Sequence, residues 1–308
     1  MKAGIYATAK LPDEARSILR GFDLFENEAN DETLAQCQIL MAWPTRAGKE
    51  LLGKMRNLIM VQVLSAGVDG LDFASLSADT LVYSNAGAYT ESVAEHAWGL
   101  MLGAAKGLST RQQRVVPRRL RGKTLLVVGC GAIGSEIARL ANSVGMNIIG
   151  VSRSFKAPEL FGEMYRTKDL PNVIGTADAI AITLPLTRST AGLFDYNTLM
   201  LSNESVTVVN VGRGDTVSED GLIRWLCERP ESRYTTDVFW KKGGKETFDT
   251  EAWNLSNFSG TLHTSGVPLG DELEHPLIEA AKNVKRFLET GHALNRVDPG
   301  EYIPLPRT

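Results

Sequence analysis

Short apolar segments alternate with stretches of helical periodicity along almost the whole chain. Apolar runs of about four to eight residues between turn residues are typical of buried strands, and their alternation with amphipathic helices indicates a parallel α/β architecture. Helical patterns follow Pro12 and cover residues 46–55. The strands predicted in the first part of the chain are residues 4–8, 38–43, 58–65 and 80–84.

A longer helix is predicted to begin near Glu91. Thr90 is a favourable N-cap, and the acidic side chain of Glu91 complements the positive end of the helix dipole. Apolar side chains then recur at helical spacing, which predicts one buried face. These side chains are Val93, Ala97, Leu100, Met101 and Ala104. We expect this helix to lead the chain out of a first domain.

The same alternation resumes after residue 123 and continues to a final helix. That helix is predicted over residues 271–290, ends at Gly291 and is expected to pack back on the first domain. Its predicted buried side chains are Leu273, Leu277, Ile278, Ala281, Val284 and Leu288. The strands predicted in this part of the chain are residues 124–129, 147–152, 179–184, 206–211, 233–238 and 261–264.

The composition is that of an ordinary globular protein, with 308 residues, 43% of them hydrophobic, and a net charge of −3. At ~100–200 residues per domain, this length predicts two domains. No apolar stretch is long enough to span a bilayer, and residues 3–9 are interpreted as a first strand rather than a signal peptide. Cys37, Cys130 and Cys227 are far apart and form no CxxC motif, so neither a disulfide framework nor a metal site is indicated. The cytoplasm is the expected location.

Residues 111–123 contain six basic side chains and no acidic one. The segment is polar and contains Pro117, so it is predicted to be a solvated arm that connects two domains. It carries no aromatic side chain, and the chain as a whole is slightly acidic. We therefore expect neither nucleic acid nor a membrane surface as a partner.

Residues 129–134 read GCGAIG and match the GxGxxG pattern. Glycines alone also mark simple turns, but here an apolar strand precedes them, and a helical stripe and a second apolar strand follow. Such a unit directs backbone N–H groups and a helix N-terminus at a pyrophosphate, and the first two glycines allow a tight turn and close approach. The residues predicted to form this dinucleotide site are Gly129, Gly131, Ala132, Ile133 and Gly134.

The end of the second strand bears on the choice between NAD and NADP. An acidic residue there normally binds the ribose 2′-OH of NAD, but this segment reads Ser152, Arg153, Ser154. A guanidinium flanked by hydroxyls can pair with a 2′-phosphate. We therefore expect NADP, with Ser152 and Arg153 at the ribose end. NAD is the alternative, in which Arg153 is an ordinary exposed turn residue.

Further motifs are spread over nearly the full chain. They are residues 65–69 (SAGVD), 85–87 (NAG), 92–96 (SVAEH), 120–124 (LRGKT), 177–178 (AD), 184–187 (LPLT), 209–214 (VNVGRG) and 237–239 (DVF). Together they resemble the D-isomer-specific 2-hydroxyacid dehydrogenases, in particular glyoxylate and hydroxypyruvate reductases. The resemblance implies an α/β protein with two doubly wound parallel-sheet domains. A Rossmann-like dinucleotide-binding domain, residues 97–270, would be inserted into a flavodoxin-like substrate domain formed by residues 1–96 and 271–308, with the active site in the cleft between them.

Arg213 follows an apolar strand, at the edge of the predicted sheet where α/β proteins bind ligands. Its planar guanidinium can hold a carboxylate through two hydrogen bonds and polarise the adjacent carbonyl group. The resemblance makes Arg213 the substrate-binding arginine, with the backbone at Ala66 and Gly67 as its partners on the substrate carboxylate. The further cofactor contacts that the resemblance implies are Leu184, Pro185, Thr190, Val211, Gly212 and Asp237.

His263 lies in a segment similar to the family's His-small-small-Gly pattern, although Leu262 stands where a proline usually precedes the histidine. Imidazole suits a hydride-transfer reaction because one proton must be given or taken near neutral pH. The family places a glutamate five residues after the aspartate of its DVF motif, where it hydrogen-bonds the histidine, but this chain has Lys242 there. The surrounding segment is rich in glycine and slightly lengthened, so Glu246 is the candidate replacement. An exposed charged loop is the alternative.

We therefore expect an oxidoreductase that interconverts a small 2-oxo acid and its D-2-hydroxy acid with NADP(H) or NAD(H). Glyoxylate and hydroxypyruvate are the substrates that the family likeness suggests, and a homodimer is the expected assembly. A fold does not determine an activity. The missing glutamate leaves open a second function, that of a non-catalytic NAD(P)-sensing protein on the same scaffold.

Overall fold

The computed structural model describes residues 3–108, 116–266 and 274–302. The chain divides into two compact units. Unit 1 comprises Met1–Tyr89 and Pro268–Thr308, and unit 2 comprises Thr90–Val267. The boundary expected between residues 96 and 97 falls inside helix α4 (Thr90–Lys106), which belongs to unit 2 as a whole. The boundary expected between residues 270 and 271 lies outside the described residues.

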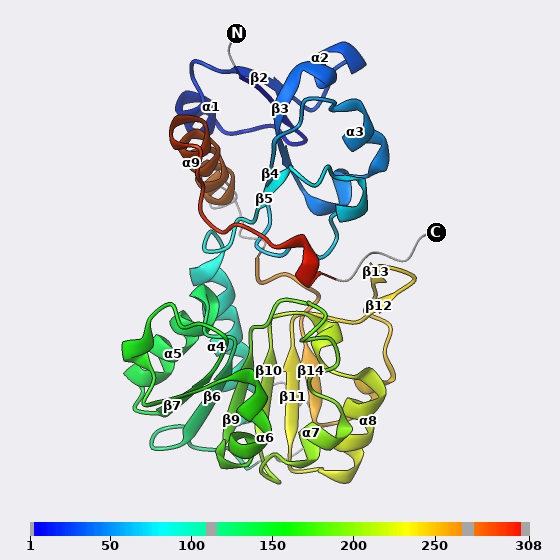
Figure 1. The fold of residues 1–308 in the computed structure, drawn as a ribbon. Coiled ribbons are helices and arrows are strands. Elements are labelled where there is room, and N and C mark those ends of the chain that lie inside the picture. The colour runs from blue at the N-terminus through cyan, green and yellow to red at the C-terminus, as the bar shows by residue number, and fades with distance from the viewer. Residues whose placement is uncertain (1–2, 109–115, 267–273, 303–308) are drawn as a thin grey trace. The chain divides into compact units, whose positions relative to one another are not determined.

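Unit 1 holds a five-stranded parallel sheet with helices on both faces (Figure 1). Its elements are β1 (Gly4–Ala7), α1 (Asp13–Ile18), β2 (Asp23–Glu26), α2 (Asp31–Gln36), β3 (Cys37–Ala42), η1 (Pro44–Arg46), α3 (Lys49–Lys54), β4 (Met60–Val63), η2 (Phe73–Ser75), β5 (Leu81–Tyr83), α9 (Glu274–Thr290) and η9 (Pro299–Glu301). The strand order β2-β1-β3-β4-β5 is the flavodoxin-like order.

The two faces of this sheet follow from the alternation of side chains along each strand. Ile39 and Met41 of β3 belong to the apolar cluster that includes α1 and α9, whereas Leu40 belongs to the cluster that includes α2 and α3. The expected return of the last helix to the first part of the chain is therefore observed, although residues 271–273 of that prediction lie outside the described residues. The sequence pattern did not predict β2 and α2. Since β2 is an exposed to half-buried edge strand, it lacks the apolar run that marks the others.

Unit 2 is built on a seven-stranded sheet in which all pairs are parallel. After α4, its elements are β6 (Thr124–Val128), α5 (Ala132–Ser143), β7 (Asn147–Val151), η3 (Pro158–Leu160), β8 (Glu163–Tyr165), η4 (Thr167–Asp169), α6 (Leu170–Val173), η5 (Ile174–Thr176), β9 (Ala179–Ile182), α7 (Tyr196–Met200), β10 (Thr207–Asn210), η6 (Gly214–Thr216), α8 (Glu219–Glu228), β11 (Arg233–Thr236), β12 (Lys241–Lys242), β13 (Lys245–Glu246), η7 (Glu251–Asn254) and β14 (Phe258–Gly260).

The order β14-β11-β10-β9-β6-β7-β8 is the Rossmann order with β14 added at one edge. Central strands such as β6 and β9 are buried on both faces, which explains their continuous apolar sequences. Helices α4 and α5 pack against each other and against the sheet, and α7 packs against α8. The predicted α/β class with two doubly wound parallel sheets is confirmed.

In unit 2, the last predicted strand is wrongly placed, and three further short strands, β8, β12 and β13, were not predicted. The last strand of the sheet, β14, ends at Gly260, and residues 261–264 form a loop instead of the expected strand. The reason is that the amides of Thr264 and Ser265 donate to the carboxylate of Asp237 rather than to a neighbouring strand. Strand β8 at the other edge is mostly exposed, and the strands of the hairpin β12–β13 are too short to show an alternating pattern.

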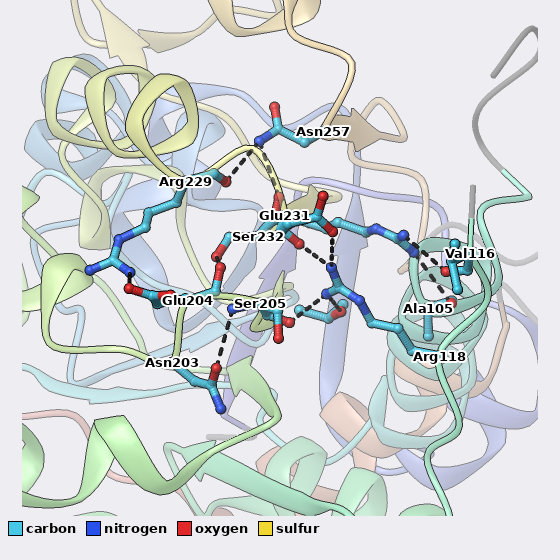
Figure 2. Close-up of polar contacts among 12 residues, drawn as sticks. Ala105, Val116, Arg118, Asn203, Glu204, Ser205, Arg229, Glu231, Ser232 and Asn257 are labelled. Carbon is cyan, nitrogen blue, oxygen red and sulfur yellow. Dashed lines mark hydrogen bonds and ion pairs between the residues drawn. The ribbon is translucent and has the colours of Figure 1, made fainter. Parts of the chain in front are cut away.

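Residues 111–115 of the basic arm lie outside the described residues, and most of residues 116–123 are exposed, as expected for a solvated segment, although Arg118 anchors this part of the chain. Arg118 donates to the carbonyls of Ser205 and Glu231 at the amino-terminal side of β10 and β11 (Figure 2). Arg233, the first residue of β11, donates to the carbonyls of Ala104 and Ala105 near the end of α4. The two arginines thus tie the end of α4 and the arm to the sheet.

Among the described residues, no helix is both long enough and apolar enough to cross a membrane.

Candidate active site

The glycine loop joins β6 to α5 as the sequence predicts. Gly129 has a φ of +104°, and a Cβ atom there would lie 2.8 Å from Thr183 Oγ1. A Cβ atom at Gly134 would lie 2.0 Å from the carbonyl oxygen of Gly129, so α5 can approach the strand only if residue 134 is glycine. Gly131 differs, because a Cβ atom there would meet nothing within 4 Å.

Gly131 is also the N-cap of α5, and within the described part of the chain no side chain caps this helix end. The N–H groups of the first helical turn therefore keep their capacity to bind an anion. Open space at Gly131 and uncapped donors at Ala132 and Ile133 are the features that a dinucleotide pyrophosphate requires. The residues present fit such a cofactor.

The end of β7 presents a basic surface. Ser152 is buried, whereas Arg153 and Arg166 are exposed. Arg166, which follows β8, donates from its guanidinium to the carbonyl oxygen of Arg153. Arg166 was not among the predicted site residues, because the edge strand that places it was not predicted.

The segments after β9 and β10 meet at the carboxyl edge of the sheet. A Cβ atom at Gly212 would lie 2.5 Å from the carbonyl oxygen of Leu184, so these two predicted cofactor residues are in direct contact. Thr190 donates to the carbonyl oxygen of Pro185 at 2.6 Å, which closes the loop after β9 on itself. The structure brings these residues together at one edge, beside Val211. Their contacts with a cofactor stay a prediction.

The turn that carries Arg213 is held by buried polar groups. The Asn210 side chain, fully buried, accepts from Gly212 N at 3.0 Å and donates to the carbonyl oxygen of Arg213 at 3.1 Å. A Cβ atom at Gly214 would lie 2.1 Å from the carbonyl oxygen of Phe239, so the turn must also be glycine-flanked. Arg213 Nη1 donates to the carbonyl oxygen of Gly212 at 2.7 Å. The backbone geometry therefore places the guanidinium at the carboxyl edge of the sheet.

His263 and Glu246 contact each other directly. His263 Nδ1 lies 2.5 Å from Glu246 Oε2, and the other carboxylate oxygen of Glu246 accepts from Phe239 N at 2.7 Å. The backbone amide fixes the carboxylate, and the carboxylate in turn fixes the imidazole ring. This pairing matches the arrangement expected from the sequence if Glu246 replaces the missing glutamate.

The hairpin β12–β13 explains why Glu246 and not Lys242 reaches the histidine. Gly243 and Gly244 both have positive φ, which is the conformation of a tight hairpin turn. The hairpin pairs Lys241 with Glu246 and thereby brings Glu246 back to Phe239. Lys242 instead donates to the carbonyl oxygen of Asp249 at 2.7 Å and pairs with Glu219 at 3.5 Å.

Asp237, predicted to contact the cofactor, is fully buried at the end of β11. Its carboxylate accepts from Thr261 Oγ1 at 2.6 Å, from Thr264 N at 2.9 Å and from Ser265 N at 3.0 Å. Burial raises the pKa of Asp237, but these hydrogen bonds outweigh burial and hold the pKa below its ordinary value. The carboxylate is thus committed to the loop that carries His263, a role that the sequence did not indicate.

Ala66 and Gly67, the predicted substrate-binding backbone, lie in unit 1, after β4. Ser65 Oγ donates to the carbonyl oxygen of Gly67 at 2.7 Å, which shapes a tight loop. Asn85, buried at the end of β5, donates to the carbonyl oxygen of Leu64 at 3.1 Å. The structure does not test the contact of these residues with a substrate.

A model of the family described as "D-isomer specific 2-hydroxyacid dehydrogenase, NAD binding domain" matches residues 81–265 of this chain. The chain belongs to this family. The resemblance inferred from the motifs is therefore confirmed, and the matched region supports binding of a nicotinamide cofactor.

Matches to individual proteins support the same family assignment. D-3-phosphoglycerate dehydrogenase of Archaeoglobus fulgidus is 26% identical and covers 86% of this chain, which corresponds to 53% of that protein. Glyoxylate reductase of Aeropyrum pernix is 31% identical over 62% of each protein. Among solved structures, a D-isomer specific 2-hydroxyacid dehydrogenase family protein from Aeromonas salmonicida has a TM-score of 0.79 at 26% identity, covering 97% of this chain and 99% of that one. The chain spans about half the length of the phosphoglycerate dehydrogenases that it matches.

Proposed function

We propose that this chain is an NAD(P)-dependent 2-oxoacid reductase that forms a D-2-hydroxy acid, with glyoxylate or hydroxypyruvate as the substrate type. The observation that carries the proposal is the direct contact of His263 Nδ1 with Glu246 Oε2 at 2.5 Å. A carboxylate carries no proton, so Nδ1 holds the hydrogen of this bond. Nε2 is then the nitrogen that exchanges a proton with the substrate.

The residues of the chain divide the work of the reaction. Arg213 would bind the substrate carboxylate through two charge-assisted hydrogen bonds, together with the backbone at Ala66 and Gly67. When bound, the reduced nicotinamide supplies the hydride that is added to C2. In the same reduction, His263 gives the proton from Nε2 to the carbonyl oxygen, and Glu246 keeps the ring oriented. The products are the D-2-hydroxy acid and the oxidised cofactor.

NADP is the cofactor we propose, on the basis of the residues at the end of β7. Ser152 and Arg153 follow that strand without an acidic residue, and the guanidinium of Arg166 is attached to the same turn. Two positive charges at the ribose end favour a 2′-phosphate. NAD is the alternative.

We expect NADPH to bind more tightly than NADH. We also expect Arg153→Ala to weaken the binding of NADPH and to leave that of NADH unchanged, and fluorescence titration with both cofactors measures these affinities. Equal or tighter binding of NADH by the wild type would contradict this preference.

The second candidate function is a non-catalytic NAD(P)-sensing protein, which the absent glutamate suggested. The contact between Glu246 and His263 favours the enzyme, because it supplies the carboxylate at the histidine from another position in the chain.

Cytoplasmic location and homodimeric assembly stay predictions from the sequence and the family likeness. Light scattering on a size-exclusion column tests the dimer.

The decisive experiment is an assay of the purified chain with NADPH and NADH against a panel of 2-oxo acids. We expect oxidation of the cofactor with glyoxylate or hydroxypyruvate. His263→Gln should lower kcat by a factor of about a hundred or more, with little change in cofactor binding. Tight cofactor binding without turnover of any 2-oxo acid would favour the sensing protein, and full activity of His263→Gln would remove this residue from the mechanism.

A further inference from the structure

The loop that carries His263 requires support from its surroundings. His263 has a φ of +53°, in the left-handed region that non-glycine residues rarely occupy. Such a conformation costs free energy and persists only where neighbouring groups hold it. Asp237 does so from the sheet, because its carboxylate accepts from three groups of residues 261–265.

Helix α4 holds the same loop at both ends. Ser92 Oγ lies 2.5 Å from the carbonyl oxygen of Ser265, and His96 Nε2 lies 2.7 Å from Thr261 Oγ1. Ser92 and His96 are four residues apart in a continuous helix, so both side chains project from the same face of α4. His263 lies between the two attachment points in the sequence.

The number of hydrogen atoms on these groups shows that His96 is the donor in its hydrogen bond with Thr261. Thr261 Oγ1 and Asp237 Oδ1 are 2.6 Å apart, and since the carboxylate has no proton, the single hydroxyl proton of Thr261 lies between them. Thr261 therefore has no proton left for His96, and His96 Nε2 must be the donor. Nε2 also lies 3.6 Å from Asp237 Oδ1, which favours the same assignment. This hydrogen bond exists whether or not the other ring nitrogen is protonated.

We propose that Ser92 and His96 are positioning residues that hold the loop of His263 in its left-handed conformation. Neither side chain contacts His263 or Glu246 in the hydrogen bonds of the described residues, so their influence passes through Thr261, Ser265 and the backbone between them. The proposal rests on the proposed function only where it concerns turnover. The support that α4 gives to the loop is a property of the protein without a substrate.

The first test measures hydrogen exchange of the whole chain by mass spectrometry, with no substrate added. His96→Leu removes the donor, whereas His96→Gln keeps an N–H group near the position of Nε2. We expect faster exchange in the segment 261–266 of His96→Leu and of Ser92→Ala, and wild-type exchange in His96→Gln. The matched control is His292→Leu, the same change at an exposed histidine of unit 1. Unchanged exchange of the loop in both His96→Leu and Ser92→Ala would overturn the proposal.

The second test is a double-mutant cycle with His263. We expect His96→Leu to lower kcat about ten- to a hundredfold by misplacing the imidazole, with the Kd of the cofactor unchanged and activity largely retained in His96→Gln. In a His263→Gln background, His96→Leu should have no further effect on kcat, because the two residues act through one group. An equal loss in both backgrounds would overturn the positioning role. If the wild type reduces no 2-oxo acid, the proposed function fails, and the exchange experiment alone still decides this proposal.

Discussion

At the scale of single residues, two carboxylates have separate tasks in unit 2. Glu246 contacts the His263 ring, whereas Asp237 holds the loop on which the ring is carried. The environments differ accordingly, since Asp237 is fully buried and Glu246 is partly exposed. Substitutions at these two positions should therefore affect different measurements.

Glu246→Gln is expected to lower kcat/KM at least about tenfold, because the amide orients the imidazole less well than the carboxylate does. Steady-state kinetics at several pH values measures the effect. Lys242→Gln is the matched control in the same hairpin, and we expect it to keep wild-type rates, since Lys242 contacts Asp249 and Glu219 instead. A larger loss in the Lys242 variant than in the Glu246 variant would contradict the pairing.

Asp237→Asn is expected to change the pH dependence of stability. The pKa of Asp237 is lowered in the folded protein, so its ionisation stabilises the fold above the unfolded value of ~3.9 and loses this effect as the pH falls through the lowered value. The variant should have a free energy of unfolding about 1–3 kcal/mol lower at neutral pH, because one acceptor of the buried carboxylate is replaced by a donor.

Urea denaturation between about pH 6 and about pH 3 checks this expectation. The wild type should lose more stability over this range than Asp237→Asn does. Parallel curves for the two proteins would show that the ionised carboxylate does not support the loop in the way the hydrogen bonds indicate.

At the scale of elements, the turn between β6 and α5 shows that glycines in one motif serve different purposes. A Cβ atom at Gly134 would collide with the backbone of Gly129, whereas a Cβ atom at Gly131 would face open space. The need for glycine at residue 134 comes from packing within unit 2. At residue 131 no packing contact in the fold described requires glycine, which is the expected situation where a ligand approaches the backbone.

Gly131→Ala is therefore expected to keep the Tm of the wild type within a few degrees while weakening cofactor binding about tenfold or more. Gly134→Ala, the matched variant three residues further along, should lower Tm markedly because the strand and helix must separate. Differential scanning fluorimetry with and without NADPH measures both properties. If Gly131→Ala binds the cofactor as the wild type does, the phosphate site lies elsewhere.

At the scale of the whole molecule, the chain forms two units that each have their own sheet and apolar clusters. Unit 2 is one continuous segment, Thr90–Val267, whereas unit 1 is assembled from both ends of the chain. The dinucleotide loop, Arg213, Glu246 and His263 all belong to unit 2. The predicted substrate-binding backbone at Ala66 and Gly67 belongs to unit 1.

We expect a fragment of residues 90–267 to fold cooperatively and to bind the nicotinamide cofactor without reducing a 2-oxo acid, because it lacks Ala66 and Gly67, whose backbone we propose to bind the substrate carboxylate. Circular dichroism, thermal unfolding and fluorescence titration test these points, with the full chain as the control. An unfolded fragment would show that unit 2 depends on unit 1 for its stability. Full reductase activity of the fragment would exclude a role for Ala66 and Gly67.

The amino-acid sequence by itself determined the α/β class, the parallel sheets, the glycine loop and the family, because each of these depends on residues close together in the chain. Strand periodicity and the GxGxxG spacing are local patterns, and the motifs around Arg213 and His263 are short. The local pattern was misleading at β2 and at residues 261–264. An exposed edge strand has no apolar run, and a loop held by a buried carboxylate resembles a strand in its sequence.

Only the tertiary structure decided which acid reaches His263 and what holds its loop. The hairpin turn at Gly243 and Gly244 brings Glu246 to the histidine and directs Lys242 away, which the spacing alone left open. Ser92 and His96 lie more than a hundred and sixty residues from their partners in the chain. Such contacts depend on how a helix packs against a sheet edge, and no local pattern of residue types records that packing.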